Sequence, residues 1–293
     1  MNTDCARPLS GCANGATDPN ATLQDIGQLY TNTSSGISDA SELQVTVDRR
    51  FAKGLSFRAA YTLGKTIDIT SGFRARSSTY TDPFDPRLDR GPADFDVRNR
   101  FVFSGSWQIP DGRLENNRVS RAIFGGWQVN TIATFQSGTP FTLYSNAGSS
   151  GQGNLLERVN IVNPISTFNA RKLQSFNSTC GGGTGANYYF DPSSFDCSLA
   201  YNTTTVLPGS LASFGDMGRN AIYGPGINNW DISFLKSFKF SESKSIEFRA
   251  EMFNAFNHVQ FLNPNNQGFS GTFGQVSQDR GPRLVQFGLK FYY

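Results

Sequence analysis

The chain has 293 residues, and its 26 Lys and Arg against 23 Asp and Glu give a formal net charge of +3. This charge is too small, and the basic residues too scattered, to indicate a nucleic-acid partner. No apolar run is long enough for a membrane-spanning helix, whereas 30 glycines and 13% aromatic residues suit strands joined by turns.

Residues 1–40 are polar and are predicted to form a loop. Alternation of apolar and polar residues begins at Leu43 and predicts a strand, which a tight turn at 51–54 connects to a second strand over about 55–64. These two strands form a predicted hairpin. A charged loop that contains proline is expected from about 66 to 96.

Two further strands are expected over about 100–109 and 127–136, with a short connection between them. The stretch from 144 to 228 shows no sustained period and is predicted to be one very long loop. Such loops are uncommon in compact soluble domains, but outer-membrane barrels carry them on their outer side.

A strand starts near Trp230, and its alternation breaks at Leu235 and Lys236, where we expect a bulge or a lysine that snorkels. The turn at 241–244 leads to a strand over about 246–252. A last long loop is expected from about 258 to 281.

The chain ends on an alternating strand whose apolar stripe includes the final residue. The residues of this stripe are Val285, Phe287, Leu289, Phe291 and Tyr293. A soluble core would seldom use the last residue, because chain ends fray, whereas the closing strand of an outer-membrane barrel sets such a stripe against lipid. We expect the stripe to act as an assembly signal as well.

The fold prediction is all-β: an antiparallel transmembrane β-barrel segment of about seven to eight strands, covering 41–293, as an open curved sheet or a partial barrel with long extracellular loops. Short and long connections alternate, which assigns the carboxy-terminus to the periplasm. Seven strands would be odd, whereas bacterial barrels have even numbers, and Met1 to Asp4 carry no signal-peptide pattern. We therefore expect further strands upstream.

One surface of the sheet is predicted to be apolar and to face lipid. The outward residues are Phe57, Tyr61, Phe103, Trp107, Val129, Phe248, Phe287, Leu289 and Phe291. Aromatic residues near strand ends are predicted to form interfacial girdles; they are Tyr61, Trp107, Trp127, Trp230, Phe291 and Tyr293.

The four cysteines form two local pairs, Cys5 with Cys12 and Cys180 with Cys197. Disulfides in exposed loops are favoured over free thiols. Zinc is disfavoured, since His258 is the only histidine and is better explained as a rim residue. We expect no cofactor and no metal.

Three groups of polar or glycine residues could form binding sites, but a structural role is favoured for each. The lumenal strip Glu247, Arg249 and Glu251 is read as an ion-pair ladder in preference to a ligand site. The glycines at 181–183 favour loop flexibility over a phosphate cradle. An ion-paired loop is favoured over calcium for one acidic segment, which contains Asp82, Asp85, Asp89, Asp94 and Asp96 among Arg74, Arg76, Arg87 and Arg90.

Six segments, in order, resemble the carboxy-terminal barrel of TonB-dependent receptors of the Oar-like group. They are 41–68, 89–110, 124–142, 228–240, 248–261, and 273–276 together with the terminal strand. The resemblance implies a barrel of about 22 strands that admits large ligands. It covers only the last third of that family, whose plug and TonB box lie at the amino-terminus. Asn99 departs from the family pattern, which has histidine there.

The sequence thus predicts the carboxy-terminal barrel segment of a TonB-dependent receptor in the outer membrane of a Gram-negative-type bacterium, with no enzymatic role. Expected partners are outer-membrane lipid, upstream strands and a plug, the barrel assembly machinery, and the TonB complex through the absent amino-terminal part. The alternative is a self-contained small pore or adhesin barrel, closed by an eighth strand from 270–277 or 1–40. A barrel hydrolase and a soluble β-sandwich rank lower. The chain alone is not expected to transport a ligand.

Overall fold

A computed structural model describes residues 36–71, 81, 85–110, 123–145, 157–197, 215–241 and 243–293. Strands dominate, and the short helical turns include two 3-10 helices, η1 (Pro86–Asp89) and η3 (Pro192–Ser194). In these ranges, no helix has the length and apolar character needed to cross a bilayer.

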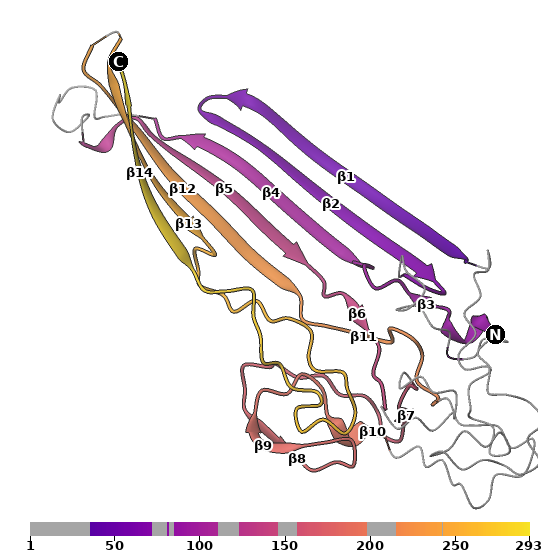
Figure 1. The fold of residues 1–293 in the computed structure, drawn as a ribbon. Coiled ribbons are helices and arrows are strands. Elements are labelled where there is room, and N and C mark those ends of the chain that lie inside the picture. Colours follow the sequence, from indigo (N-terminus) through magenta and orange to yellow (C-terminus); the bar gives the residue numbers. More distant parts are fainter. Residues whose placement is uncertain are drawn as a thin grey trace, which may run out of the picture.

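Seven long strands form one antiparallel sheet, which we call the wall (Figure 1). In sheet order they are β1 (Ser38–Ala52), β2 (Leu55–Asp68), β4 (Asn99–Gln108), β5 (Trp127–Gln136), β12 (Ile227–Lys239), β13 (Ser245–Phe253) and β14 (Leu284–Tyr292). The two-residue strand β3 (Gly91–Pro92) pairs with the end of β2. The all-β antiparallel prediction is confirmed.

The register keeps the alternation of each strand in phase with its neighbours. Val45 lies opposite Tyr61, which lies opposite Phe101, which lies opposite Phe135. Directly opposed residues of an antiparallel pair point to the same face. One face of the wall is therefore apolar across all seven strands, and the other face is polar.

Short and long connections alternate, as predicted, and lie at opposite ends of the wall (Figure 1). The carboxy-terminus lies at the end with the short connections. At the first short turn, Lys53 and Gly54 both have positive φ, 53° and 79°, as tight hairpin turns require. The long connections gather at the other end, where β1 begins.

The strand bounds differ from prediction mainly at the ends that lie beside the long connections. β1 begins at Ser38, within the segment predicted as loop, and β2 continues to Asp68. Polar residues such as Ser41 and Lys65 pair there, so the ladder extends beyond the apolar stripe that was used for prediction. Residues 1–35 lie outside the described part of the chain.

No bulge interrupts β12 at Leu235 and Lys236, because their pairing with both β5 and β13 is continuous. Lys236 therefore points to the apolar face, and the snorkelling alternative is the correct one. The register shift in this sheet lies elsewhere, between Arg49 and Ala52 of β1, immediately before the first turn.

The segment predicted as one long loop, 144–228, contains five short strands among its described residues. Together with β6 (Pro140–Phe141), which precedes it, they form three small sheets: β6 with β11 (Ile222–Tyr223), β7 (Asn160–Ile161) with β10 (Phe195–Asp196), and β8 (Gln174–Phe176) with β9 (Gly183–Ala186). Strands of two to four residues are too short to produce a visible period in the sequence.

The wall is open. Among the described residues, no strand pairs with the outer edge of β1 or of β14, which stand at opposite ends of the strand order. Because each strand reverses its neighbour and the wall has seven strands, β1 and β14 run in the same direction.

Candidate functional site

The apolar face of the wall is a continuous surface of aromatic and aliphatic side chains. Ring centroids lie 5.8 Å apart for Phe57 and Phe103 and 6.2 Å apart for Phe248 and Phe287. Phe287 is 73% exposed and Leu289 is 74% exposed. A single layer that leaves such large side chains uncovered would be unfavourable in water and fits a hydrocarbon solvent. The predicted outward set shares this face, as the register shows.

Aromatic residues with polar tips occupy both ends of the apolar face. Trp127, beside a short connection, donates its Nε1–H to the carbonyl of Ile123 at 3.1 Å. Tyr61, nearer the long connections, donates its hydroxyl to Oδ1 of Asn99 at 2.6 Å. Asn99 thus accepts the hydroxyl hydrogen bond of a predicted girdle residue. Such amphipathic rings are typical of membrane interfaces.

Tyr293 follows the last residue of β14, and its ring stacks on that of Phe291 with centroids 6.1 Å apart. The other stripe residues of the terminal strand face the apolar side together with Ile246, Phe248 and Met252 of β13. The stripe predicted as an assembly signal is therefore solvent-accessible over its whole length.

Lys236 is the charged residue on the apolar face of β12. Its ammonium donates to the carbonyls of Ile123 and Gly125, and lies 5.3 Å from the ring centroid of Trp127 and 5.1 Å from that of Phe238. These contacts leave Lys236 only 3% exposed. The aliphatic stem lies on the apolar face while the charge reaches carbonyl oxygens at the end of the strand.

The polar face carries ion pairs and hydrogen-bonded amides. Arg249 Nε lies 2.6 Å from Glu247 Oε1, and Gln286 donates to Glu251. These are the residues of the predicted lumenal strip, which the wall aligns on one side of β13. On the first hairpin, Arg58 and Asp48 form a second pair at 2.6 Å.

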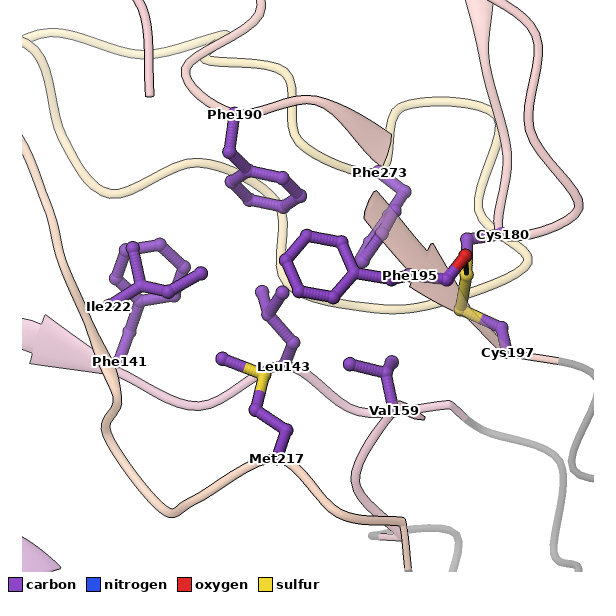
Figure 2. Close-up of a cluster of buried hydrophobic side chains, with 10 residues drawn as sticks. All are labelled: Phe141, Leu143, Val159, Cys180, Phe190, Phe195, Cys197, Met217, Ile222 and Phe273. Carbon is purple, nitrogen blue, oxygen red and sulfur yellow. Dashed lines mark hydrogen bonds between the residues drawn. A yellow bond between two sulfur atoms is a disulfide. The ribbon is translucent and has the colours of Figure 1, made fainter. Parts of the chain in front are cut away.

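Two of the three long connections fold together into a body that we call the loop unit: 137–145, 157–197, 215–226 and 254–283. Figure 2 shows its buried core, with the residues Phe141, Leu143, Val159, Cys180, Phe190, Phe195, Cys197, Met217, Ile222 and Phe273. Phe273 comes from the last connection and packs edge-on against Phe190, with centroids 5.1 Å apart. Two connections that are distant in sequence therefore share one core.

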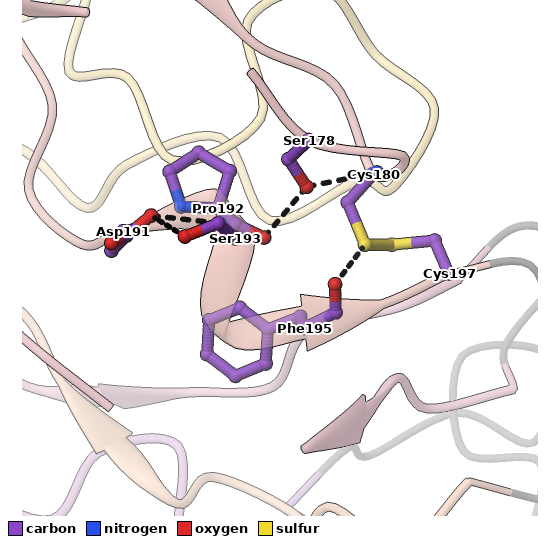
Figure 3. Close-up of a disulfide and its surroundings, with 7 residues drawn as sticks. All are labelled: Ser178, Cys180, Asp191, Pro192, Ser193, Phe195 and Cys197. Carbon is purple, nitrogen blue, oxygen red and sulfur yellow. Dashed lines mark hydrogen bonds between the residues drawn. A yellow bond between two sulfur atoms is a disulfide. The ribbon is translucent and has the colours of Figure 1, made fainter. Parts of the chain in front are cut away.

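A disulfide joins Cys180 and Cys197, which are 17 positions apart and fully buried (Figure 3). Ser178 accepts from the Cys180 amide at 3.1 Å and donates to the carbonyl of Pro192 at 2.8 Å. Asp191 caps the 3-10 helix η3 by accepting from the Ser193 amide. Cys5 and Cys12 lie outside the described residues.

Glycine at 181 is required for packing and does not provide flexibility, which corrects the sequence interpretation. Its φ is +121°, and a Cβ there would lie 2.2 Å from the carbonyl oxygen of Ser270. Only glycine tolerates both conditions. His258 also has a structural role, because its backbone exchanges two hydrogen bonds with the Asn254 side chain, both 2.9 Å long.

A polar cluster that we call the latch joins the loop unit to the β2–β4 part of the wall. Its residues are Asp68, Asp94, Asp96, Arg219 and Tyr223. Arg219 Nη1 lies 2.5 Å from Asp68 Oδ1, and its Nη2 lies 3.1 Å from Asp94 Oδ1. The Tyr223 hydroxyl donates to Asp96 at 2.7 Å and accepts from Arg98 at 2.9 Å.

Ion pairing of the acidic segment is confirmed, although the main cations come from elsewhere. Asp89 pairs with Arg158 of the loop unit at 3.6 Å, and Asp85 pairs locally with Arg87. Burial lowers the pKa of Arg158, which the nearby Asp89 carboxylate opposes. In the ranges that the structure describes, no group of three or more metal-ligating side chains occurs. Asp82, Arg74 and Arg76 lie outside those ranges.

Sequence reasoning missed Arg158, Arg219, Asn220 and Tyr223. One feature of the sequence could have indicated that such partners exist. The acidic segment 85–96 has more carboxylates than arginines, so some of its carboxylates need cations from elsewhere in the chain. Arg158 and Arg219 lie in a stretch without periodicity, so the sequence did not indicate which arginines would pair with these carboxylates.

Residues 2–286 match the family model described as Outer membrane beta barrel domain. The chain belongs to this family. Its place is therefore the outer membrane, and the apolar face of the wall is its lipid-facing side. No curated protein matches the sequence.

Proposed function

We propose that this outer-membrane barrel chain forms the carboxy-terminal part of the wall of a TonB-dependent receptor of the Oar-like type, which takes up a large ligand. The six ordered motifs support the proposal. Two of them contain latch residues: 41–68 contains Asp68, and 89–110 contains Asp94 and Asp96. The role proposed for these residues is to shape a passage and its mouth, without catalysis.

The observation that carries the proposal is the pair of free edges. An unpaired edge leaves backbone donors and acceptors that lipid cannot satisfy, at a cost of several kcal/mol for each group. The wall therefore needs strands from outside the described residues on both sides. A receptor barrel of about 22 strands would supply them.

The direction of the edges argues against a barrel closed from these seven strands alone. Of the two segments that could supply an eighth strand, 270–277 belongs to the loop unit and not to the wall. Since β1 and β14 run in the same direction, closing these seven strands alone would require a parallel pair. Single-chain bacterial barrels have even, antiparallel strand sets. An additional set with an odd number of strands restores that pattern, and neither edge of the wall then meets the other.

The proposed partners follow from the same geometry. Lipid contacts the apolar face, the barrel assembly machinery recognises β14, and an amino-terminal plug links the barrel to TonB. The polar face, with Glu247, Arg249 and Glu251, would line the passage.

The proposal is tested by extending the reading frame upstream of Met1 in genomic DNA and expressing the extended protein beside residues 1–293. We expect the extended protein to bind the periplasmic domain of TonB and the shorter one not to bind it. A frame with no plug, or a discrete closed pore made by residues 1–293 alone, would contradict the proposal and favour the small-barrel alternative.

A further inference from the structure

The regular ladder between β5 and β12 is interrupted and then resumes as β6 and β11; within the interruption, one backbone hydrogen bond remains, from the Gly224 amide to the Thr139 carbonyl at 3.0 Å. Residues 137–139 and 224–226 separate the two parts, and the register is the same on both sides. The backbones nearly touch at the interruption: a Cβ at Gly138 would lie 1.9 Å from the carbonyl oxygen of Gly224. Only glycine allows this approach, so the interruption is built into the sequence.

Beyond the interruption, the β6–β11 ribbon reaches the polar side of the wall. Asp68 is an even number of positions from Arg58 and Thr62 on β2, so it lies on the same, polar face as they do. Arg219, four residues before Tyr223 of the ribbon, binds the Asp68 carboxylate, which is 4% exposed. Figure 1 shows β6 and β11 beside β3 at this end of the wall.

The contacts of the ribbon with the wall are specific. Asn220 donates from Nδ2 to the Pro92 carbonyl at 2.8 Å and to Asp94 at 2.6 Å. A Cβ at Gly91 would lie 2.4 Å from the carbonyl oxygen of Arg219. Backbone contact, buried charge and amide hydrogen bonds therefore coincide at one place, which distinguishes the latch from incidental surface ion pairs.

Hydrogen bonds and a shared core hold the loop unit behind the ribbon together. Tyr189 donates its amide to Gly274 and Val276 donates to Asn187, with distances of 2.9 Å and 2.8 Å. Tyr144 likewise donates to Asn266 at 3.0 Å. These bonds and the shared core tie the 137–226 connection to the 254–283 connection, so displacement of one connection from the wall would also displace the other.

We propose that the loop unit is a lid over the lumenal side of the wall and that the Arg219 latch holds it closed. The lid controls the access of solutes from outside to the polar face. This inference rests on the proposed function only in taking the polar face as the lining of an uptake passage. Loss of the latch frees the lid to pivot at the interruption between Gly138 and Gly224.

The test uses the full-length protein in the outer membrane, with Cys5 and Cys12 replaced by serine and Thr62→Cys as a reporter on the polar face. De-energised cells, without added ligand, are treated with a bulky polyethylene-glycol maleimide. We expect Arg219→Ala to speed labelling about tenfold, as a tenfold shift of the opening equilibrium would. Arg219→Lys should give an intermediate rate.

Arg87→Ala is the matched control. Arg87 lies in the acidic segment that supplies Asp94 and Asp96 to the latch, but it forms an exposed ion pair with Asp85 and, among the described residues, no ion pair or hydrogen bond with the loop unit. Its labelling rate should equal that of the parent. Heat-modifiable migration reports whether each variant is assembled. If Arg219→Ala does not assemble, Tyr223→Phe, which removes only a hydroxyl from the latch, replaces it and should also speed labelling.

A labelling rate equal to that of the parent, in a latch variant that is assembled, would contradict the proposal that the loop unit is a lid held closed by Arg219. Because the assay uses neither TonB nor ligand, this failure is distinct from failure of the receptor proposal, which the TonB-binding experiment reports separately.

Discussion

The ammonium of Lys236 lies 5.3 Å from the ring centroid of Trp127, its direct neighbour across the sheet on the apolar face. The same ammonium donates to two carbonyls of the adjoining short connection. A charge on the lipid-facing side is thus held at the end of the strand that lies beside the short connections, where hydrogen bonding and cation–π attraction offset its lost hydration.

Replacing Lys236 by methionine keeps the stem and removes the charge. We expect the free energy of unfolding to fall by about 1–3 kcal/mol, because two carbonyls lose a charged donor. Denaturant titration of the assembled protein in lipid measures it. Lys239→Met is the control, since Lys239 is exposed and lies on the opposite face. Equal effects of the two substitutions would contradict the assigned role.

Adjacent residues of β4 provide a matched test of the two faces. Phe103 belongs to the apolar face and Ser104 to the polar face. Phe103→Arg should destabilise the barrel by about 2–4 kcal/mol, because it sets a cation against hydrocarbon, whereas Ser104→Arg should be tolerated. The heat-modifiable fraction in isolated outer membranes gives the comparison. The face assignment fails if Ser104→Arg is the more damaging change.

Phe273 ties the two large connections together. Phe273→Ala should cost the loop unit about 3–5 kcal/mol, because a fully buried ring is removed from a shared core. Limited proteolysis of intact cells should then cleave both connections faster. Phe269→Ala, in the same connection but 53% exposed, serves as control. Faster cleavage of the 254–283 connection alone would show that the two fold independently.

Reduction of the Cys180–Cys197 disulfide should loosen the loop unit and leave the wall intact. Closing a loop of this length contributes about 3 kcal/mol by chain entropy. A Cys180→Ser, Cys197→Ser double variant should therefore show faster proteolysis of the 157–197 segment with unchanged heat-modifiable migration. Loss of the assembled band would mean that the disulfide is needed for the barrel itself.

The wall could be predicted from sequence because membrane strands are long and repeat with a period of two. The stripes at Leu43, Phe57 and Phe287 locate their strands directly. Lys236 could not be resolved, since a bulge and a snorkelling lysine break the alternation in the same way. The partners of its ammonium all lie more than 100 positions away in sequence: they are the ring of Trp127 and the carbonyls of Ile123 and Gly125, on another strand and its connection.

The loop unit was not predictable in the same way. Its strands are two to four residues long, and its core residues, such as Leu143, Phe190 and Phe273, are isolated in polar surroundings. The Arg219–Asp68 pair spans 151 positions. No local pattern encodes such a distance.

The most direct test of the central claim, that this chain is an open part of a larger barrel, is cysteine cross-linking across the edges in native outer membranes. Cysteines at Gln44 or Thr46 of β1 are combined with cysteines at Gln286 or Gly288 of β14, with Cys5 and Cys12 replaced by serine. The pair Thr46 and Ala60, which are directly opposed on β1 and β2, is the positive control. We expect the control to cross-link and every β1–β14 combination to remain reduced. A disulfide between β1 and β14 would show that these strands close on themselves and would contradict the account.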